Sequence, residues 1–165
     1  IEQAAQSCIA TFRSGGKVLF CGNGGSAADA QHIAAELSGR FYTDRPPLYA
    51  EALHVNASYM TAVANDYSFD TVYERMMEGL AKERDVLLAF STSGNSENII
   101  RAIQAAKHQK AAVIGFTGLT GGKMKDICHC TIQIPSDDTP RIQEGHILLG
   151  HLLCEQVEKA LFPAQ

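Results

Sequence analysis

The sequence predicts an α/β fold in which a doubly wound parallel sheet of about five strands is covered by helices on both faces. Short runs of consecutive apolar residues alternate with helical patterns along all 165 residues. Strands of a parallel sheet are buried on both faces, so they are apolar throughout and do not alternate with polar residues. A strand followed each time by a helix is the repeating unit of such a sheet.

The strands are predicted from five short apolar runs. They lie at 17–21, 48–55, 85–91, 111–117 and 130–135. The intervening segments have helical patterns at 1–12, 27–40, 56–64, 69–82 and 97–109, a short turn at 123–127 and a closing helix from 141 onward. Pro46 and Pro47 make 44–49 a loop, because proline cannot continue a helix.

The first helical segment carries an apolar stripe formed by Ala5, Cys8, Ile9 and Phe12. So short a chain offers no evident second layer to cover this stripe. The stripe therefore favours packing against another subunit.

Length and composition indicate one globular domain over residues 1–165. The chain is 45% hydrophobic and 19% charged, with a net charge of -4. It has no basic block, which argues against a nucleic-acid binder that works through general electrostatics. We expect no membrane span, because no apolar run is long enough to cross a bilayer.

The first residues of the chain and its cysteines indicate where the protein resides in the cell. Because the first residue is Ile1, we expect that an amino-terminal helix has been shortened, and no signal peptide is visible. The five scattered cysteines are expected to be reduced, which favours a cytoplasmic protein. The Cys128-His129-Cys130 run lacks a second pair that would complete a metal site.

Two glycine- and serine-rich loops follow strands and open helices. GNGGSAAD (22–29) follows the first strand and STSGNSEN (91–98) the third. In a parallel sheet both loops lie at the carboxyl edge, where free helix N–H groups and the helix dipole favour phosphate. The first loop also fits G-x-G-x-x-A, but no acidic residue at the end of the second strand would hold a ribose. Ser26 and Asp29 have capping-box spacing, so part of this loop reads as a helix start.

The second loop is rich in hydroxyl groups. It supplies Ser91, Thr92, Ser93 and Ser96 around Gly94. Such density predicts a hydrogen-bonding cradle for a phosphomonoester. The alternative is a polar turn in which Asn95 or Ser96 caps the next helix.

Two helices carry residues suited to binding a divalent metal. His32 and Glu36 are four residues apart and share one helical face. In the closing helix, Gln143 and His151 are separated by about 12 Å of helical rise, so both reach one ion only with extended side chains. His146 lies on another face and is expected to be a hydrogen-bonded, partly buried imidazole.

Several motifs together resemble the sugar isomerase (SIS) family and, within it, the phosphoheptose isomerases. They are GNGGSAADAQHIAAEL, VANDY, LLAFSTSGNSENI, FTGLTGGKM and RIQEGHILLGH. The resemblance implies a flavodoxin-like SIS fold, assembled as a homotetramer with active sites at subunit interfaces. It also implies conversion of sedoheptulose 7-phosphate to D-glycero-D-manno-heptose 7-phosphate, the first step toward activated heptose for lipopolysaccharide or capsule.

The same resemblance implies roles for individual residues. One zinc ion per subunit would be held by His32, Glu36, Gln143 and His151. Substrate would be bound by Asn23, Gly24, Gly25, Ser26, Glu36, Asn65, Asp66, Ser91, Thr92, Ser93, Ser96 and Gln143. Pro140 departs from the family pattern, since many relatives carry Asp there; Asp138 or Thr139 would have to replace any contact which that Asp makes.

An aldose–ketose isomerase moves a proton between C1 and C2 through an enediol. Such chemistry needs a base over the carbon and an acid or base for the oxygens. We expect Glu36 to serve the carbon and His151 the oxygens. The main alternative is a non-catalytic SIS protein that binds a phosphosugar or a replication-initiator partner, but such proteins typically lack counterparts of these two residues. A SIS isomerase of pentose or hexosamine phosphates is a further alternative, which the four zinc ligands disfavour.

Overall fold

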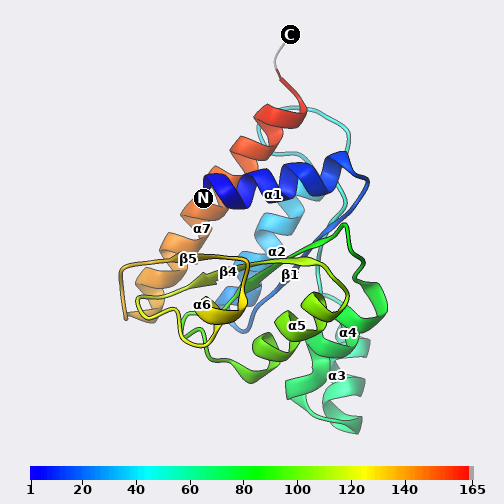
Figure 1. The fold of residues 1–165 in the computed structure, drawn as a ribbon, viewed down its shortest axis with the longest axis vertical. Coiled ribbons are helices and arrows are strands. Elements are labelled where there is room, and N and C mark those ends of the chain that lie inside the picture. Colours follow the sequence, from blue (N-terminus) through cyan, green and yellow to red (C-terminus); the bar gives the residue numbers. More distant parts are fainter. Residues whose placement is uncertain (164–165) are drawn as a thin grey trace.

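The computed structural model, which describes residues 1–163, contains a five-stranded parallel sheet between two layers of helices (Figure 1). The strands are β1 (Val18–Cys21), β2 (Ala50–Ala52), β3 (Val86–Phe90), β4 (Ala112–Thr117) and β5 (Cys130–Gln133). Their order across the sheet is β2-β1-β3-β4-β5. This is the flavodoxin-like order of a doubly wound sheet, so the predicted fold class is confirmed.

The helices form two layers. One layer consists of α1 (Glu2–Arg13), α2 (Gly25–Ser38) and α7 (Thr139–Leu161). The other consists of α3 (Ala57–Asp66), α4 (Val72–Leu80), α5 (Glu97–His108) and α6 (Met124–Ile127), with the 3-10 turn η1 (Phe69–Thr71) before α4. None of the helices within residues 1–163 is long and apolar enough to cross a lipid bilayer.

Alternate residues of the central strands fill two separate cores. Phe20 and Leu88 face α1, α2 and α7, whereas Leu19 and Leu87 face α4 and α5. All four side chains are fully buried. Burial on both faces explains why these strands are continuously apolar in the sequence.

Several predicted boundaries shift in the structure. The strand expected at 48–55 is reduced to Ala50–Ala52, and the helix expected at 69–82 begins as η1 and ends at Leu80. Helix α2 begins at Gly25 with Gly24 at its N-cap, so the expected capping box of Ser26 and Asp29 is wrong. Ser26 lies inside the first helical turn and is buried there.

The apolar stripe of α1 is covered within the chain. Ala5, Cys8 and Ile9 are buried, because α1 packs across α7 and the ends of β1 and β3 (Figure 1). The expectation that this stripe lacks a second layer is therefore wrong, and α1 gives no reason for association with another subunit. The expectation of reduced cysteines agrees with the structure, because all five cysteines lie in the described region and none of them forms a disulfide.

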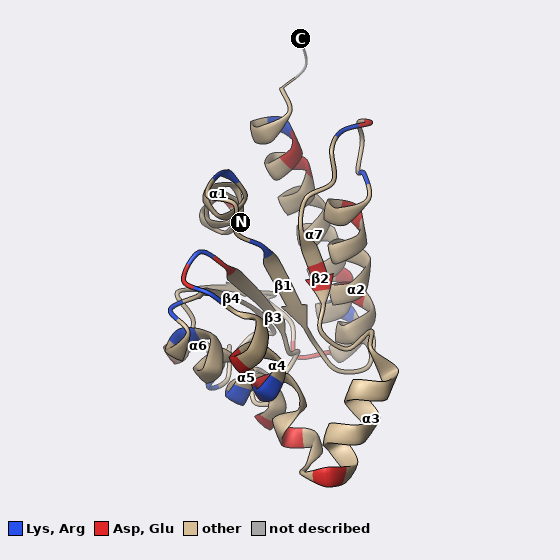
Figure 2. Cartoon of the chain, turned by 90° about the vertical axis from the view of Figure 1, so that its right-hand side faces the viewer, with Lys and Arg blue, Asp and Glu red and all other residues tan. Residues whose placement is uncertain are grey.

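Helices α2 and α7 run side by side (Figure 2) and approach closely at two glycines. They run in the same direction, because Gly25 meets Gln143 and, farther along both helices, Ile33 meets Gly150. A Cβ added at Gly150 of α7 would lie 2.6 Å from Cδ1 of Ile33, and one at Gly25 of α2 would lie 2.5 Å from the Gln143 amide nitrogen. A larger residue at Gly150 would collide with the buried Ile33 side chain, whereas one at Gly25 would displace the end of the Gln143 side chain. The contact with Ile33 explains the helix-weakening glycine at 150, and the other one in α7, Gly145, lies against Ile134 just after β5.

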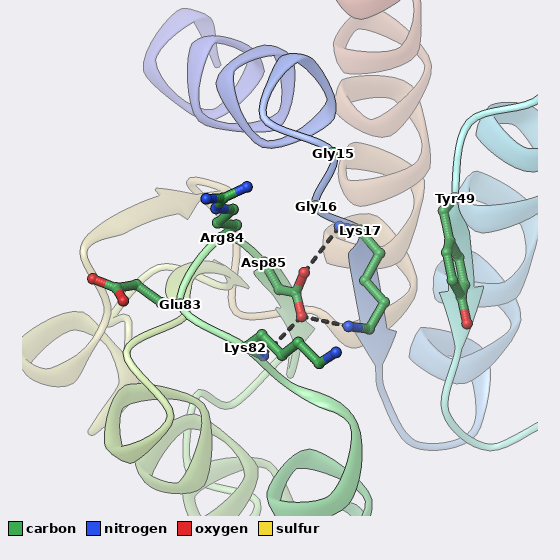
Figure 3. Close-up of a pocket in the computed structure, with 8 residues that line it drawn as sticks. All are labelled: Gly15, Gly16, Lys17, Tyr49, Lys82, Glu83, Arg84 and Asp85. Carbon is green, nitrogen blue, oxygen red and sulfur yellow. Dashed lines mark hydrogen bonds and ion pairs between the residues drawn. The ribbon is translucent and has the colours of Figure 1, made fainter.

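At the amino edge of the sheet, Asp85 ties the start of β3 to the start of β1 (Figure 3). One carboxylate oxygen accepts the Lys17 backbone N–H at 3.0 Å, and the other accepts the Lys17 ammonium group and the Lys82 backbone N–H. Asp85 is only 3% exposed. A buried carboxylate with this many donors holds the register of the two central strands at the edge opposite the predicted site.

A second buried ion pair joins α7 to the loop 39–49. Arg45 Nε donates to Glu158 Oε2 at 3.0 Å, and the two side chains are 2% and 5% exposed. Glu158 also accepts the backbone N–H groups of Phe41, Tyr42 and Thr43. Burial alone would raise the pKa of the Glu158 carboxyl, but the bonds from Arg45 and the backbone outweigh burial and lower this pKa.

We predict that Glu158→Gln lowers the free energy of unfolding by about 3 kcal/mol at neutral pH, because Arg45 loses a buried countercharge. The lowered pKa means that the carboxylate stabilises the fold above its unfolded pKa of about 4.3, and that this stabilisation is lost as pH falls through the folded value. The stability difference between the two proteins should therefore be constant near neutrality and narrow in acid. Denaturant titrations at several pH values measure it.

Glu155→Gln on the same helix is the matched control. Its partner Lys159 is largely exposed, so the loss should stay within about 0.5 kcal/mol. A Glu158→Gln difference that is unchanged in strong acid would contradict the prediction.

Candidate functional site

The carboxyl edge of the sheet brings the two predicted loops together. The first loop turns sharply at Gly24, whose φ of +55° lies in the left-handed region that favours glycine. Its Gly22 carbonyl oxygen accepts a 2.6 Å hydrogen bond from the Tyr73 hydroxyl, which comes from α4 on the other face of the sheet. The turn is therefore fixed by backbone geometry and by a buried phenol.

The hydroxyl groups of the second loop cluster as expected. Ser91 Oγ lies 3.1 Å from Ser96 Oγ and 3.5 Å from Ser93 Oγ. Ser96 occupies the N-cap position of α5, yet its hydroxyl faces Ser91 and makes no capping bond to the first turn. The alternative in which the Ser96 side chain caps α5 is therefore wrong.

The two loops and the start of α7 enclose a cavity of about 300 Å³. It is lined by Asn23, Gly24, Gly25, Ser26, Phe90, Ser91, Thr92, Ser96, Thr139 and Gln143. Eight of these ten residues are among the substrate contacts expected from sequence. Of the two residues suggested as substitutes for a contact at position 140, Thr139 lines this cavity, and its contact with substrate stays a prediction.

Three side chains of α2 and α7 converge farther along the same helix pair. His32 Nε2 lies 3.0 Å from His151 Nε2 and 3.1 Å from Glu36 Oε1. One ligand atom from each residue lies within 4.8 Å of the others. Two imidazole nitrogens and a carboxylate oxygen form a donor set suited to a divalent metal, so this triad can hold an ion.

Gln143 belongs to the cavity end of α7. Its amide packs against Gly25, and about 12 Å of helical rise separates it from His151. Its expected role as a fourth ligand of the same ion stays a prediction.

Other predicted site residues lie apart from the cavity lining. Asn65 and Asp66 are exposed at the end of α3, where the Asn65 amide donates to Asp66 at 2.9 Å. Ser93 faces a neighbouring hollow that it shares with Thr92 and Thr139. In the described chain these residues are therefore not grouped with the cavity.

His146 is fully buried beneath the site. Its Nε2 donates to the Thr117 carbonyl oxygen at 3.1 Å, and its ring meets Phe90 and Phe116 edge-on. Burial lowers the pKa of this imidazole, more than the hydrogen bond raises it. The expected structural role is confirmed, with deeper burial than expected.

Asp29 lies one helical turn before His32 on α2. Its Oδ2 is buried and has no hydrogen-bond partner among the described residues. Burial raises the pKa of this carboxyl, while nearby His32 lowers it. Sequence had assigned Asp29 to a helix cap, so its unpaired oxygen was not foreseen.

Asn98 lies behind the cavity and holds one of its lining residues, Asn23, a role that the sequence did not reveal. Its amide and that of Asn23 exchange two hydrogen bonds, both 2.9 Å long, which join the first loop to α5. Asn98 is 3% exposed although it is polar. The sequence offered one sign of this burial, since Asn98 stands beside Ile99 on the face of α5 that packs on the sheet.

Comparisons with known proteins agree with this fold. Residues 1–118 match the SIS domain family. A phosphoheptose isomerase of Rhodospirillum rubrum is 54% identical over 161 residues, which are 98% of this chain and 86% of that protein.

Two solved structures of phosphoheptose isomerases are similar to the whole chain. The protein from Neisseria gonorrhoeae matches with a TM-score of 0.90 at 43% identity, and that from Francisella tularensis with 0.92 at 38%. Each comparison covers 96% of this chain and 84% of the other. The chain therefore belongs to the phosphoheptose isomerase branch of the SIS domain family.

We predict that Asn98→Ala lowers the free energy of unfolding by about 1–2 kcal/mol, because the Asn23 amide loses both of its bonds. Asn23→Ala should cost a similar amount. The double variant should cost less than the sum, with a coupling of about 1 kcal/mol, since both single changes remove the same interaction. Denaturant unfolding of the four proteins measures this cycle, and strictly additive losses would show that the pair is not coupled.

Proposed function

We propose that the chain interconverts sedoheptulose 7-phosphate and D-glycero-D-manno-heptose 7-phosphate through an enediol, as the first step of activated-heptose synthesis for lipopolysaccharide or capsule. The observation that carries the proposal is the pairing of a hydroxyl-rich cavity with a His–Glu–His triad on one helix pair. The identity with phosphoheptose isomerases over nearly the whole chain supports the same reaction.

The cavity suits the phosphate end of such a substrate. The start of α2 and the hydroxyls of Ser91 and Thr92 line it, so helix N–H groups and side-chain donors meet there. We assign Asn23, Gly24, Gly25, Ser26 and Ser96, which line the cavity, to this phosphate-binding group as well. We add Ser93, which lies beside the cavity with its Oγ 3.5 Å from Ser91 Oγ.

The separation of cavity and triad suits a long sugar. Gly25 and His32 are seven residues apart on α2, which corresponds to about 10 Å of helical rise. In a heptose 7-phosphate the reacting C1 and C2 lie at the opposite end of the carbon chain from the phosphate. A substrate bound by its phosphate in the cavity would thus extend toward Glu36 and His151.

The triad supports zinc as the bound ion. His32, Glu36 and His151 would hold it, with Gln143 as a fourth ligand reaching along α7. Zinc takes nitrogen ligands at about 2.0–2.1 Å, so donors of a single ion lie within a few ångströms of each other, as the two Nε2 atoms do. When bound, the ion would act as a Lewis acid on the sugar carbonyl.

Glu36 and His151 would carry the protons. We assign to Glu36 the transfer of the proton between C1 and C2, and to His151 the protons of the two oxygens. Glu36 is half-buried and His151 lies 3.0 Å from His32, so both are held in place while still reached from solvent. The assignment requires Asn65, Asp66 and Gln143 to complete the sugar contacts.

We further infer a cytoplasmic homotetramer with active sites at subunit interfaces. Leu148 and Leu152 flank His151 on α7 and are 61% and 38% exposed. Exposed apolar side chains grouped on one helix support burial by another subunit.

We predict that Glu36→Gln and His151→Ala each reduce the turnover of sedoheptulose 7-phosphate by about 10²–10⁴-fold, the usual contribution of a general acid or base. Product formation followed by NMR measures the rate, and circular dichroism checks the fold. Glu155→Gln, at a half-buried position paired with Lys159, and His108→Ala, at an exposed position, lie outside the site and should keep wild-type rates. Undiminished turnover in both site variants would remove these residues from the mechanism.

We also predict that the protein binds one zinc ion per subunit and that a chelator abolishes turnover, which added zinc restores. His32→Ala should lower the zinc content measured by elemental analysis, because it removes one of three converging donors. Full activity after verified metal removal would reduce the ion to an accessory role.

A further inference from the structure

The ring of Phe41 covers the imidazole of His151. Their centroids lie 5.8 Å apart with only 25° between the ring planes, so the two rings are stacked. Phe41 belongs to the loop 39–49 between α2 and β2 and is half-buried. The His151 ring also meets the ring of His32 edge-on, with the centroids 5.1 Å apart.

The backbone of Phe41 is fixed by Glu158, seven residues beyond His151 on the same helix. Glu158 accepts hydrogen bonds from the backbone N–H groups of Phe41 at 3.3 Å, Tyr42 at 2.9 Å and Thr43 at 3.0 Å. Three consecutive N–H groups on one buried carboxylate leave the loop little freedom to move away from α7.

The other half of the ion pair fixes Glu36. Arg45 donates to the backbone carbonyl oxygen of Glu36 at 2.8 Å and to that of Leu37 at 2.9 Å. These are among the last carbonyl groups of α2, which have no partner within the helix. One buried Arg45–Glu158 pair thus connects the helix end that carries Glu36 with the loop that covers His151.

We propose that Phe41 is a positioning residue that holds the His151 ring in its working orientation, and that the Arg45–Glu158 pair holds Phe41. The proposal rests on the proposed function. The torsion that turns a histidine ring about its Cβ–Cγ bond is broad, so backbone placement alone does not fix where Nε2 points. A stacked aromatic ring restricts that torsion and keeps Nε2 directed at His32 and Glu36.

The test compares three variants in the zinc-loaded full chain. Phe41→Leu keeps an apolar side chain but removes the aromatic ring that stacks on His151. Phe41→Tyr keeps this ring. Tyr49→Leu is the control, because it removes an exposed aromatic ring at the far end of the same loop (Figure 3). We expect Phe41→Leu to lower kcat by about 10- to 100-fold with KM changed less than about 2-fold, because orientation is lost and phosphate binding is not. Phe41→Tyr and Tyr49→Leu should keep wild-type kcat.

A second measurement separates positioning from mere packing and from the reaction itself. Competition with a chromogenic chelator should show zinc affinity reduced by about 10-fold in Phe41→Leu and unchanged in Tyr49→Leu, as expected for a residue that orients a ligand. Phe41→Leu with a lower melting temperature but wild-type kcat and zinc affinity would overturn the proposal. Failure of the wild-type chain to convert the sugar would refute the proposed function instead, and zinc affinity would still test Phe41.

Discussion

The close contact between α2 and α7 is the constraint on which the site depends. At Gly25 and Gly150 each helix offers no side chain, so Gln143 and Ile33 of the other helix fill the space. Helices this close can bring His32 and His151 to hydrogen-bonding distance although 119 residues separate them in the chain. A larger residue at Gly150 would meet Ile33 at 2.6 Å, so Ile33 or α7 would have to shift, and a shift of α7 would move His151 relative to His32 and Glu36.

Close helix packing also divides the site by function. Donors for an anion gather where both helices begin, at the carboxyl edge of the sheet, and the titratable residues gather farther along the same pair. The helix starts supply fixed dipoles and N–H groups, whereas the middle of the helices supplies side chains at regular spacing. A single pair of elements can therefore bind one end of a long molecule and act on the other.

Features that repeat locally were predictable from sequence. Continuous apolar strands define the parallel sheet, glycine- and serine-rich loops define its ligand edge, and the spacing of His32 and Glu36 defines one half of the triad. Features that depend on tertiary contacts were not. The cover of α1 by α7 and the Asn23–Asn98 pair join segments distant in sequence, and each polar residue involved reads locally as an ordinary turn or helix residue. The cap expected at Ser26 failed because Gly24 can adopt a positive φ and starts the helix earlier.

The bond from Tyr73 to Gly22 joins the first loop to the helix layer on the opposite face of the sheet, as the Asn23–Asn98 pair also does. α4 belongs to the layer opposite α2 and α7, yet its phenol reaches the carbonyl at the root of the first loop. A change in α4 that displaced the Tyr73 ring would remove this bond and so act directly on the backbone of the first loop. Residues on the face of the sheet away from His32 and His151 therefore help to hold the backbone of the loop that would contact a ligand.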